Sequence, residues 1–367
     1  MTPYGVRHAE VPLTPADPVR ARPGDVGGAA GLGKPDDEAI IYADGTMEGV
    51  RRWELGGIHG ARPVRDPADV TGPADVASLV PDVASLQTLL GDDGYLADDG
   101  LATALFCAVR LGQPLLLEGE AGVGKTAAAK ALAQALDTPM IRLQCYEGID
   151  IAEAVYEWNY PRQLLAIRLA ESAGNPLGAD DLFRRDYLIE RPLLRAVEHA
   201  GPRPVILLID EIDRADEHFE ALLLELLAER SITIPEIGTV HAAVPPVAVL
   251  TSNRTRDLHD ALKRRCLYHW IDHPDVARVV AIVRRRVPAA TETLAAQAAA
   301  AAGRLRTLDL QKSPGTAEVI DWVHAAQLLG LRELNTDAVA RTLGSVLKYR
   351  EDRETAVAAG LDWVVGG

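Results

Sequence analysis

Residues 119–126 of this 367-residue chain carry glycines, a lysine and a hydroxyl at a spacing that suits phosphate binding. The segment reads GEAGVGKT and fits the pattern GxxxxGK[ST], with an apolar stretch before it and an alanine-rich one after it. Glycines allow backbone N–H groups to turn inward around an anion, and a helix that begins there points its positive end at the same place. Lys125 can reach the β- and γ-phosphates, and Thr126 can hold Mg²⁺ through its hydroxyl. We therefore expect ATP and Mg²⁺ as cofactors, in contact with Gly119, Glu120, Ala121, Gly122, Val123, Gly124, Lys125, Thr126 and Asp210.

An acidic pair ends the apolar run PVILLIDEIDRA at 204–215. Such a run suits a parallel strand that is covered on both faces, and parallel sheets bind ligands beyond the carboxyl ends of their strands. Asp210 can then take the outer shell of Mg²⁺, and Glu211 can polarise the attacking water. The alternative is that the pair only caps the next helix. Beside a phosphate loop, we favour the catalytic interpretation.

Three more polar residues follow later apolar segments. Asn253 ends VAVLTSN, and its amide can donate to a γ-phosphate oxygen and accept from the water, although a lone Asn there is often a turn residue. Arg264 and Arg265 close the segment DLHDALKRR. One of them can stabilise transition-state charge as an arginine finger, and the alternative is a solvated charge cluster.

Cysteine and histidine do not indicate a second site. Cys266, His269 and His273 have metal-like spacing, but residues three apart on a strand point to opposite faces, which argues against zinc. Cys145 has no histidine partner in a recognisable arrangement, so we do not expect a nucleophile there.

Composition limits the classes of partner. The formal net charge is −15, the sequence pI is about 5.1, 48% of the residues are apolar and 25% are charged. A protein whose main partner is nucleic acid usually carries a basic excess, so we expect no nucleic-acid partner. Three cysteines fit a reducing compartment, and we find neither a signal segment nor a long apolar run. These features predict a cytoplasmic protein.

Alternation of strands with helices predicts an α/β fold with a parallel sheet and helices on both faces. The hairpin that we expect at 231–246 has its turn near Glu236, Ile237 and Gly238. The expected strands are 114–119, 138–146, 204–215, 247–253 and 266–272, and the expected helices of this part are 95–113, about 126–136, most of 147–200, and 219–230.

The chain divides into three parts by composition and pattern. Residues 1–80 are rich in Pro, Gly, Asp and Ala, and we interpret them as a largely disordered extension or docking arm. Within it, GGAAGLGKP at 27–35 lacks the hydroxyl residue of a phosphate loop, so we interpret it as linker. The segment 37–46 has a short apolar run, and a small hairpin or docking strand is an alternative to disorder there. Residues 81–272 form the nucleotide-binding domain. The pattern of residues 273–367 predicts a helical domain. We expect its helices near 275–286, 292–306, 316–328, 335–349 and 353–364.

Together with the phosphate loop, the segments ILLIDEIDRA, ERSITIPEIG and LTSNRTRDLHDALKRR resemble an AAA+ ATPase of the MoxR type. RLQCYEGIDIAEAVYEWNYPRQLL and ALKRRCLYHWID are most similar to the branch associated with carbon monoxide dehydrogenase maturation (CoxD-like). The resemblance covers about residues 81–367. It implies a P-loop NTPase module with a parallel five-strand sheet of order 5-1-4-3-2, a C-terminal all-helical lid, and assembly into a ring, usually a hexamer.

The resemblance also implies roles for single residues. It implies that Asn253 is the sensor 1 residue and that Arg265, rather than Arg264, is the arginine finger. It also implies that the hairpin at 231–246 faces the pore of the ring. Gln144 takes the place of the polar residue that can turn the catalytic glutamate away. One departure is Gly315, which stands where an arginine often follows Ser-Pro, and leaves Lys312 as a candidate substitute.

These implications predict an ATPase that couples Mg-ATP hydrolysis to the remodelling or maturation of a client protein complex, including insertion of a metal cofactor. Family members commonly act with a partner that bears a von Willebrand A domain, and the client would be an enzyme such as a molybdenum hydroxylase. Two alternatives stay open. One is a nucleic-acid translocase of the restriction type, which the acidic charge disfavours, and the other is a nucleotide-dependent regulatory switch, which Glu211 disfavours.

Overall fold

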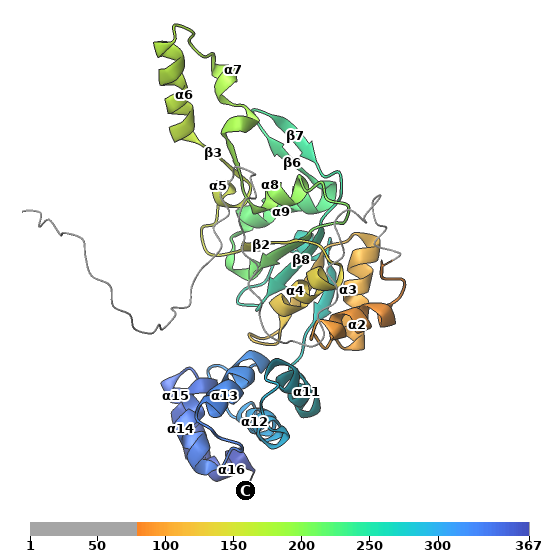
Figure 1. The fold of residues 1–367 in the computed structure, drawn as a ribbon, viewed down its shortest axis with the longest axis vertical. Coiled ribbons are helices and arrows are strands. Elements are labelled where there is room, and N and C mark those ends of the chain that lie inside the picture. The colour runs from red at the N-terminus through yellow and green to blue at the C-terminus, as the bar shows by residue number, and fades with distance from the viewer. Residues whose placement is uncertain (1–78, 367) are drawn as a thin grey trace, which may run out of the picture. The chain divides into compact units, whose positions relative to one another are not determined.

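The computed structural model describes residues 79–366, and a five-stranded parallel sheet lies at its centre (Figure 1). Adjacent strands follow the order β2-β5-β8-β1-β9, so that numbering these five strands along the chain and reading from β9 gives 5-1-4-3-2. Every neighbouring pair is parallel, and the predicted five-strand parallel sheet is confirmed. Each strand lies inside its predicted range: β1 (Leu115–Glu118), β2 (Met140–Gln144), β5 (Ile206–Asp210), β8 (Val247–Ser252) and β9 (Leu267–Trp270).

Both faces of the sheet are buried, because successive strand residues point to opposite sides. Along β5, Ile206 and Leu208 pack into one apolar core, whereas Leu207 and Ile209 pack into another. The helices α2 (Val83–Asp92), α3 (Asp99–Leu111) and α4 (Lys125–Ala135) contribute to the first core, and α8 (Pro192–Val197) and α9 (Glu217–Glu229) to the second. This double coverage explains why the strands read as continuous apolar runs.

The region 147–200 differs from the mostly helical prediction. It contains α5 (Ile151–Ala154), β3 (Tyr156–Trp158), α6 (Tyr160–Ser172), α7 (Ala179–Leu182), the short 3-10 helix η2 (Arg185–Tyr187) and β4 (Leu188–Glu190). β3 and β4 pair in antiparallel fashion. The Trp158 ring meets Phe183 edge-on, with ring centroids 5.2 Å apart. Strands of three residues are too short to show an alternating pattern, which is why the sequence did not reveal this pair.

The predicted hairpin between α9 and β8 is confirmed. β6 (Ser231–Ile234) and β7 (Gly238–His241) pair in antiparallel fashion across a turn at 235–237. Ile232 and Ile234 are buried in the same core as α9, whereas Glu236 at the turn is exposed. Most of the apolar side chains of the hairpin therefore anchor it to its own domain.

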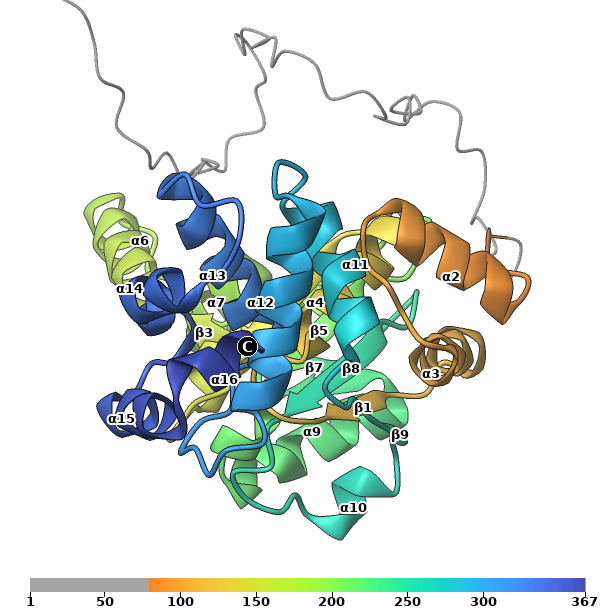
Figure 2. The same ribbon diagram turned by 90° about the horizontal axis from the view of Figure 1, so that it is seen from below.

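Residues 276–365 are helical, as predicted, and have an apolar core of their own. The helices are α11 (Val276–Arg286), α12 (Glu292–Leu305), α13 (Thr316–Leu328), α14 (Thr336–Val346), α15 (Arg350–Ala359) and α16 (Leu361–Val365). α12 contacts α11, α13 and α16 (Figure 2). The last predicted helix, 353–364, is in fact two helices, because Gly360 interrupts it with φ of 96°.

The described residues also bear on membrane helices and on the predictions for the N-terminal part of the chain. Within residues 79–366, no helix combines the length and apolar character that a membrane crossing requires. The expectations for 27–35, 37–46 and nearly all of the 1–80 extension lie outside the described residues.

The core of the C-terminal helices can be tested at Trp322. This side chain is fully buried, and its indole N–H donates to Thr342 Oγ1 at 2.7 Å. We expect Trp322→Ala to lower the free energy of unfolding by about 3–5 kcal/mol, because it leaves a large cavity. Trp322→Phe is the milder control. Urea unfolding followed by circular dichroism measures both, and a loss below about 1 kcal/mol for the alanine variant would contradict the packing described.

Candidate nucleotide site

The loop between β1 and α4 adopts the backbone that glycine permits. Gly122 and Gly124 have φ of 80° and 103°, and Gly124 is the residue that caps the N-terminus of α4. A Cβ at Gly119 would lie 2.4 Å from the Ile271 carbonyl oxygen, so no larger residue fits there. Left-handed angles are unfavourable for side chains other than glycine. The loop thus places backbone N–H groups and the first turn of a helix around one concave surface.

Lys125 is buried beneath this loop. Its Nζ donates to the carbonyl oxygens of Gly119 and Glu120, both at 2.7 Å. Burial lowers the pKa of the ammonium, and the carboxylates of Asp213, Asp210 and Glu211 oppose that shift. The Lys125 ammonium therefore binds the carbonyl oxygens of the loop and lies near the carboxylates at the end of β5.

The Asp210 carboxylate joins three elements at the carboxyl edge of the sheet. It is 2% exposed. Thr126 Oγ1 of α4 donates to Asp210 Oδ1 at 3.0 Å, and Thr251 Oγ1 of β8 donates to the same oxygen at 2.5 Å. Hard oxygen donors of this kind are what Mg²⁺ prefers, so Thr126 and Asp210 fit this ion. Thr126 and Asp210, which we expect to hold Mg²⁺, are thus neighbours in the structure.

Glu211 has an unusual backbone. Its φ is 56°, which is uncommon for a residue other than glycine, and such strain gathers at functional sites. The Glu211 N–H donates to Thr251 Oγ1 at 2.9 Å. Its Oε2 accepts from Gln144 Nε2 at 3.1 Å and pairs with Arg214 Nε at 2.8 Å. The side chain is 33% exposed, so water can reach the carboxylate.

Asn253 lies directly after β8, which is bonded to both β1 and β5. It therefore sits at the same edge as the phosphate loop and the acidic pair. Nearby, the buried Glu118 accepts hydrogen bonds from Ser252 Oγ at 3.3 Å and Tyr268 Oη at 3.1 Å. Sequence reasoning did not single out Glu118, although an acidic residue at the end of an apolar strand was a signal.

Arg264 and Arg265 lie apart from the other candidates. Both are exposed after the short helix α10 (Asp260–Lys263), and Arg265 Nη1 donates to the Ala261 carbonyl at 3.1 Å. Across residues 79–366, no hydrogen bond or ion pair joins either arginine to the phosphate loop, Asp210 or Glu211. The structure does not bring them into the site within one chain.

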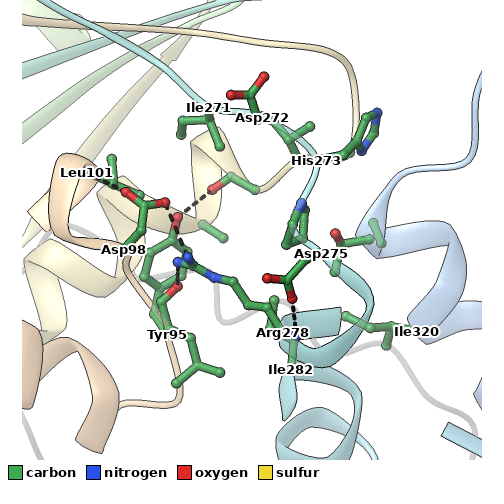
Figure 3. A pocket seen from close by; sticks show the side chains of 18 of the residues that line it. Tyr95, Asp98, Leu101, Ile271, Asp272, His273, Asp275, Arg278, Ile282 and Ile320 are labelled. Atoms are coloured by element: carbon green, nitrogen blue, oxygen red, sulfur yellow. Dashed lines mark hydrogen bonds and ion pairs between the residues drawn. The ribbon is translucent and has the colours of Figure 1, made fainter. Parts of the chain in front are cut away.

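A cavity of about 420 Å³ adjoins the phosphate loop at Gly122–Gly124 (Figure 3). Tyr95, Asp98 and Leu101 line one side, and Arg278 and Ile282 of α11 another. Arg278 Nη1 pairs with Asp98 Oδ2 at 3.3 Å, and Tyr95 Oη donates to the Gly124 carbonyl at 3.4 Å. Burial raises the pKa of the Tyr95 phenol, so it stays protonated. No sequence motif marked this cavity, because its walls come from distant segments.

The C-terminal helices touch the phosphate loop at one point. Thr316 N, at the start of α13, donates to the Gly122 carbonyl at 3.0 Å. A Cβ at Gly315 would lie 2.7 Å from Gly122 Cα, so the position that lacks an arginine is one where the two backbones meet. Lys312 Nζ pairs with Glu318 Oε1 at 3.3 Å. Of the described residues, Arg306 Nη2 is among the buried side-chain atoms without a hydrogen-bond partner.

The structure gives no support for the rejected sites. Among residues 79–366, no group of three or more His, Cys, Asp or Glu side chains is arranged to hold a metal ion. Cys145 is buried, which raises its pKa to about 12 and makes the thiolate unavailable at neutral pH.

Comparison with known proteins identifies an ATPase domain. Residues 99–237 match the family model described as AAA ATPase domain. An uncharacterized protein of Staphylococcus aureus strain USA300 is 29% identical over 180 residues, which cover 47% of this chain and 60% of that protein. Its counterpart in the bovine strain RF122 gives the same values. The chain thus spans about 60% of the length of these curated relatives.

Solved structures give a weaker likeness. RuvB of Thermotoga maritima, a Holliday junction branch migration motor, is 18% identical with a TM-score of 0.36, and each chain is covered to 66%. A mutant of the same protein is 21% identical with a TM-score of 0.40, again with 66% of each chain covered. Scores this low carry no argument about activity. The match over 99–237 is what shows an ATPase domain in this chain.

The link between Asp210 and Glu211 can be tested at Thr251, which is 1% exposed. Its hydroxyl donates to Asp210 and accepts from the Glu211 N–H. We expect Thr251→Val to destabilise the protein by about 1–3 kcal/mol, because the isosteric side chain leaves the Glu211 N–H without its partner and removes one of the hydrogen bonds to Asp210. Thr251→Ser keeps the hydroxyl and should lose much less. Urea unfolding compares the two, and equal losses would show that the methyl group rather than the hydroxyl matters.

Proposed function

We propose that this ATPase binds Mg-ATP with residues 119–126 and hydrolyses it at the carboxyl edge of the sheet. The observation that carries the proposal is the chain of hydrogen bonds from Thr126 through Asp210 and Thr251 to Glu211. It holds the phosphate loop, a metal-binding carboxylate and an accessible second carboxylate in one fixed arrangement, which the hydrolysis of a bound nucleotide requires.

Each residue has a role in this proposal. The loop amides and Lys125 bind the β- and γ-phosphates, and Thr126 and Asp210 hold Mg²⁺, which neutralises charge on the phosphate oxygens when it is bound. Glu211 accepts the proton of the attacking water, and Asn253 orients that water from the end of β8. Glu120, Ala121 and Val123 contribute backbone groups to the loop.

We assign the cavity beside Gly122–Gly124 to the nucleoside. Its volume of about 420 Å³ lies within the usual range of small-molecule sites. α11 and α13 of residues 273–367 contribute to its lining, together with segments of 81–272. The two parts would therefore respond together to nucleotide, which supports the assignment of the C-terminal helices as a lid.

The exposed arginines support assembly of several copies. Arg265, or its neighbour Arg264, lies outside the site of its own chain and would reach the γ-phosphate bound by an adjacent subunit of a ring, which we propose is a hexamer. The exposed turn of the β6–β7 hairpin would then face the pore of that ring. Its buried isoleucines tie it to the core that includes Ile209 at the end of β5, so it can move with the site.

We propose a MoxR-type role, in the branch that acts in maturation of carbon monoxide dehydrogenase. The work would be remodelling or metal-cofactor insertion in a client such as a molybdenum hydroxylase, together with a partner that carries a von Willebrand A domain. The support is the set of sequence segments that resemble this family. The net charge of −15 favours a protein client over nucleic acid.

The chemistry is tested by separating binding from turnover. We expect Glu211→Gln to bind Mg-ATP at near wild-type affinity and to lower kcat at least about 100-fold, because it keeps the shape of the site but loses the base. Lys125→Ala should lose binding as well. Calorimetric ATP affinity and phosphate release measure both properties. A Glu211→Gln protein with the wild-type rate would refute the assignment of the base.

The ring is tested by mixing two inactive variants. If Arg265 acts on the neighbouring subunit, Arg265→Ala subunits mixed with Glu211→Gln subunits should recover part of the activity. An interface between one of each can combine an intact base with an intact arginine. Phosphate release is measured across mixing ratios, with mixed assemblies verified by native mass spectrometry. Absence of recovery in verified mixed rings would contradict a finger supplied by the neighbour.

A further inference from the structure

Arg142 joins the two carboxylates of the site. Its Nε and Nη2 donate to Asp210 Oδ2 at 2.9 and 2.6 Å, and Nη2 also donates to Gln144 Oε1. Gln144 in turn donates to Glu211 Oε2 at 3.1 Å. One continuous chain of hydrogen bonds therefore runs from the metal-binding carboxylate to the proposed base.

The sheet register fixes this arrangement. Gln144 of β2 is paired with Asp210 of β5, and Arg142 is paired with Leu208. Strand residues two apart point to the same face, so Arg142, Gln144 and Asp210 share one face of the sheet. β2 is an edge strand of this sheet, and the Arg142 side chain is 46% exposed, whereas that of Asp210 is 3% exposed. The guanidinium can therefore move outward, and the carboxylate cannot follow it.

From this geometry we infer that Arg142 is a positioning residue that couples metal binding at Asp210 to the release of Glu211 from Gln144. The inference rests on the proposed function. A cation held by Asp210 would place a second positive charge on a carboxylate that already binds the Arg142 guanidinium at 2.6 Å, and like charges close together repel each other. Arg142 then leaves Asp210 toward solvent, draws the Gln144 amide with it through Oε1, and so frees Glu211 from Gln144.

The first test compares ATP affinity with and without metal. The probe is ATP itself, measured calorimetrically on the full chain in EDTA and in excess Mg²⁺. We expect Arg142→Gln to raise the ratio of Mg-ATP affinity to ATP affinity about tenfold, because it removes a charge that competes with the metal and attracts metal-free phosphate. Arg142→Lys keeps the charge and should change the ratio less than about threefold.

The second test addresses the base. In Arg142→Gln, Gln144 stays on Glu211, so kcat at saturating Mg-ATP should fall about tenfold. Adding Gln144→Ala should restore it, since the hydrogen bond to Glu211 is then removed directly, while the altered affinity ratio remains. Gln144→Ala alone should keep the wild-type affinity ratio. Arg191→Gln is the matched control, because Arg191 is also half-exposed and pairs with a carboxylate, Glu157, at 2.5 Å.

The outcomes separate this inference from the proposed function. A wild-type protein that binds neither ATP nor Mg-ATP overturns the proposed function and this inference with it. A wild-type protein that binds both, with an Arg142→Gln ratio within twofold of the wild type and the Arg191→Gln control, overturns the inference alone. So does a double variant that shows no recovery of kcat. Thermal unfolding midpoints confirm that each variant is folded. Should Arg142→Gln not fold, Arg142→Met also removes the charge and is measured in its place, with the same expected ratio and the same overturning result.

Discussion

The site depends on one buried carboxylate. Asp210 is withdrawn from water at the end of a strand that is covered on both faces, and a buried charge is tolerated only where hydrogen bonds and opposite charge satisfy it. Thr126 supplies a bond from the first turn of α4, Thr251 from β8 and Arg142 from β2. The hydrogen bonds that satisfy this one group therefore link the start of α4, next to the phosphate loop, to the strands β2, β5 and β8.

The burial of Asp210 also makes the two adjacent carboxylates of the site different from each other. The Asp210 carboxylate is buried and held by short hydrogen bonds, whereas the Glu211 carboxylate, one residue further along in a left-handed conformation, is 33% exposed. Two adjacent acidic residues thus have different surroundings, which suits one for holding a cation and the other for accepting a proton. The backbone strain at Glu211 is offset by the rigid strand before it and the hydrogen bond from its N–H to Thr251.

A second close contact links the loop to the C-terminal helices. Gly122 and Gly315 approach so closely that neither could carry a side chain without displacing the other backbone, and the Thr316 N–H binds the Gly122 carbonyl. The glycine that replaced an expected arginine is therefore required by packing. Lys312 pairs with Glu318, and Arg306 Nε donates to the Pro314 carbonyl beside this contact at 2.7 Å.

Local patterns of the sequence determined the phosphate loop, the five strands of the parallel sheet, the β6–β7 hairpin and the helical C-terminal part, because glycine spacing and apolar periodicity are properties of neighbouring residues. Tertiary structure alone decided the partners of Asp210, the cavity beside Gly122–Gly124 and the β3–β4 pair. Arg142 and Asp210 are 68 residues apart along the chain, and only the register of β2 against β5 brings them together. Side-chain contacts between distant segments depend on how the strands pair, and no local pattern encodes that pairing.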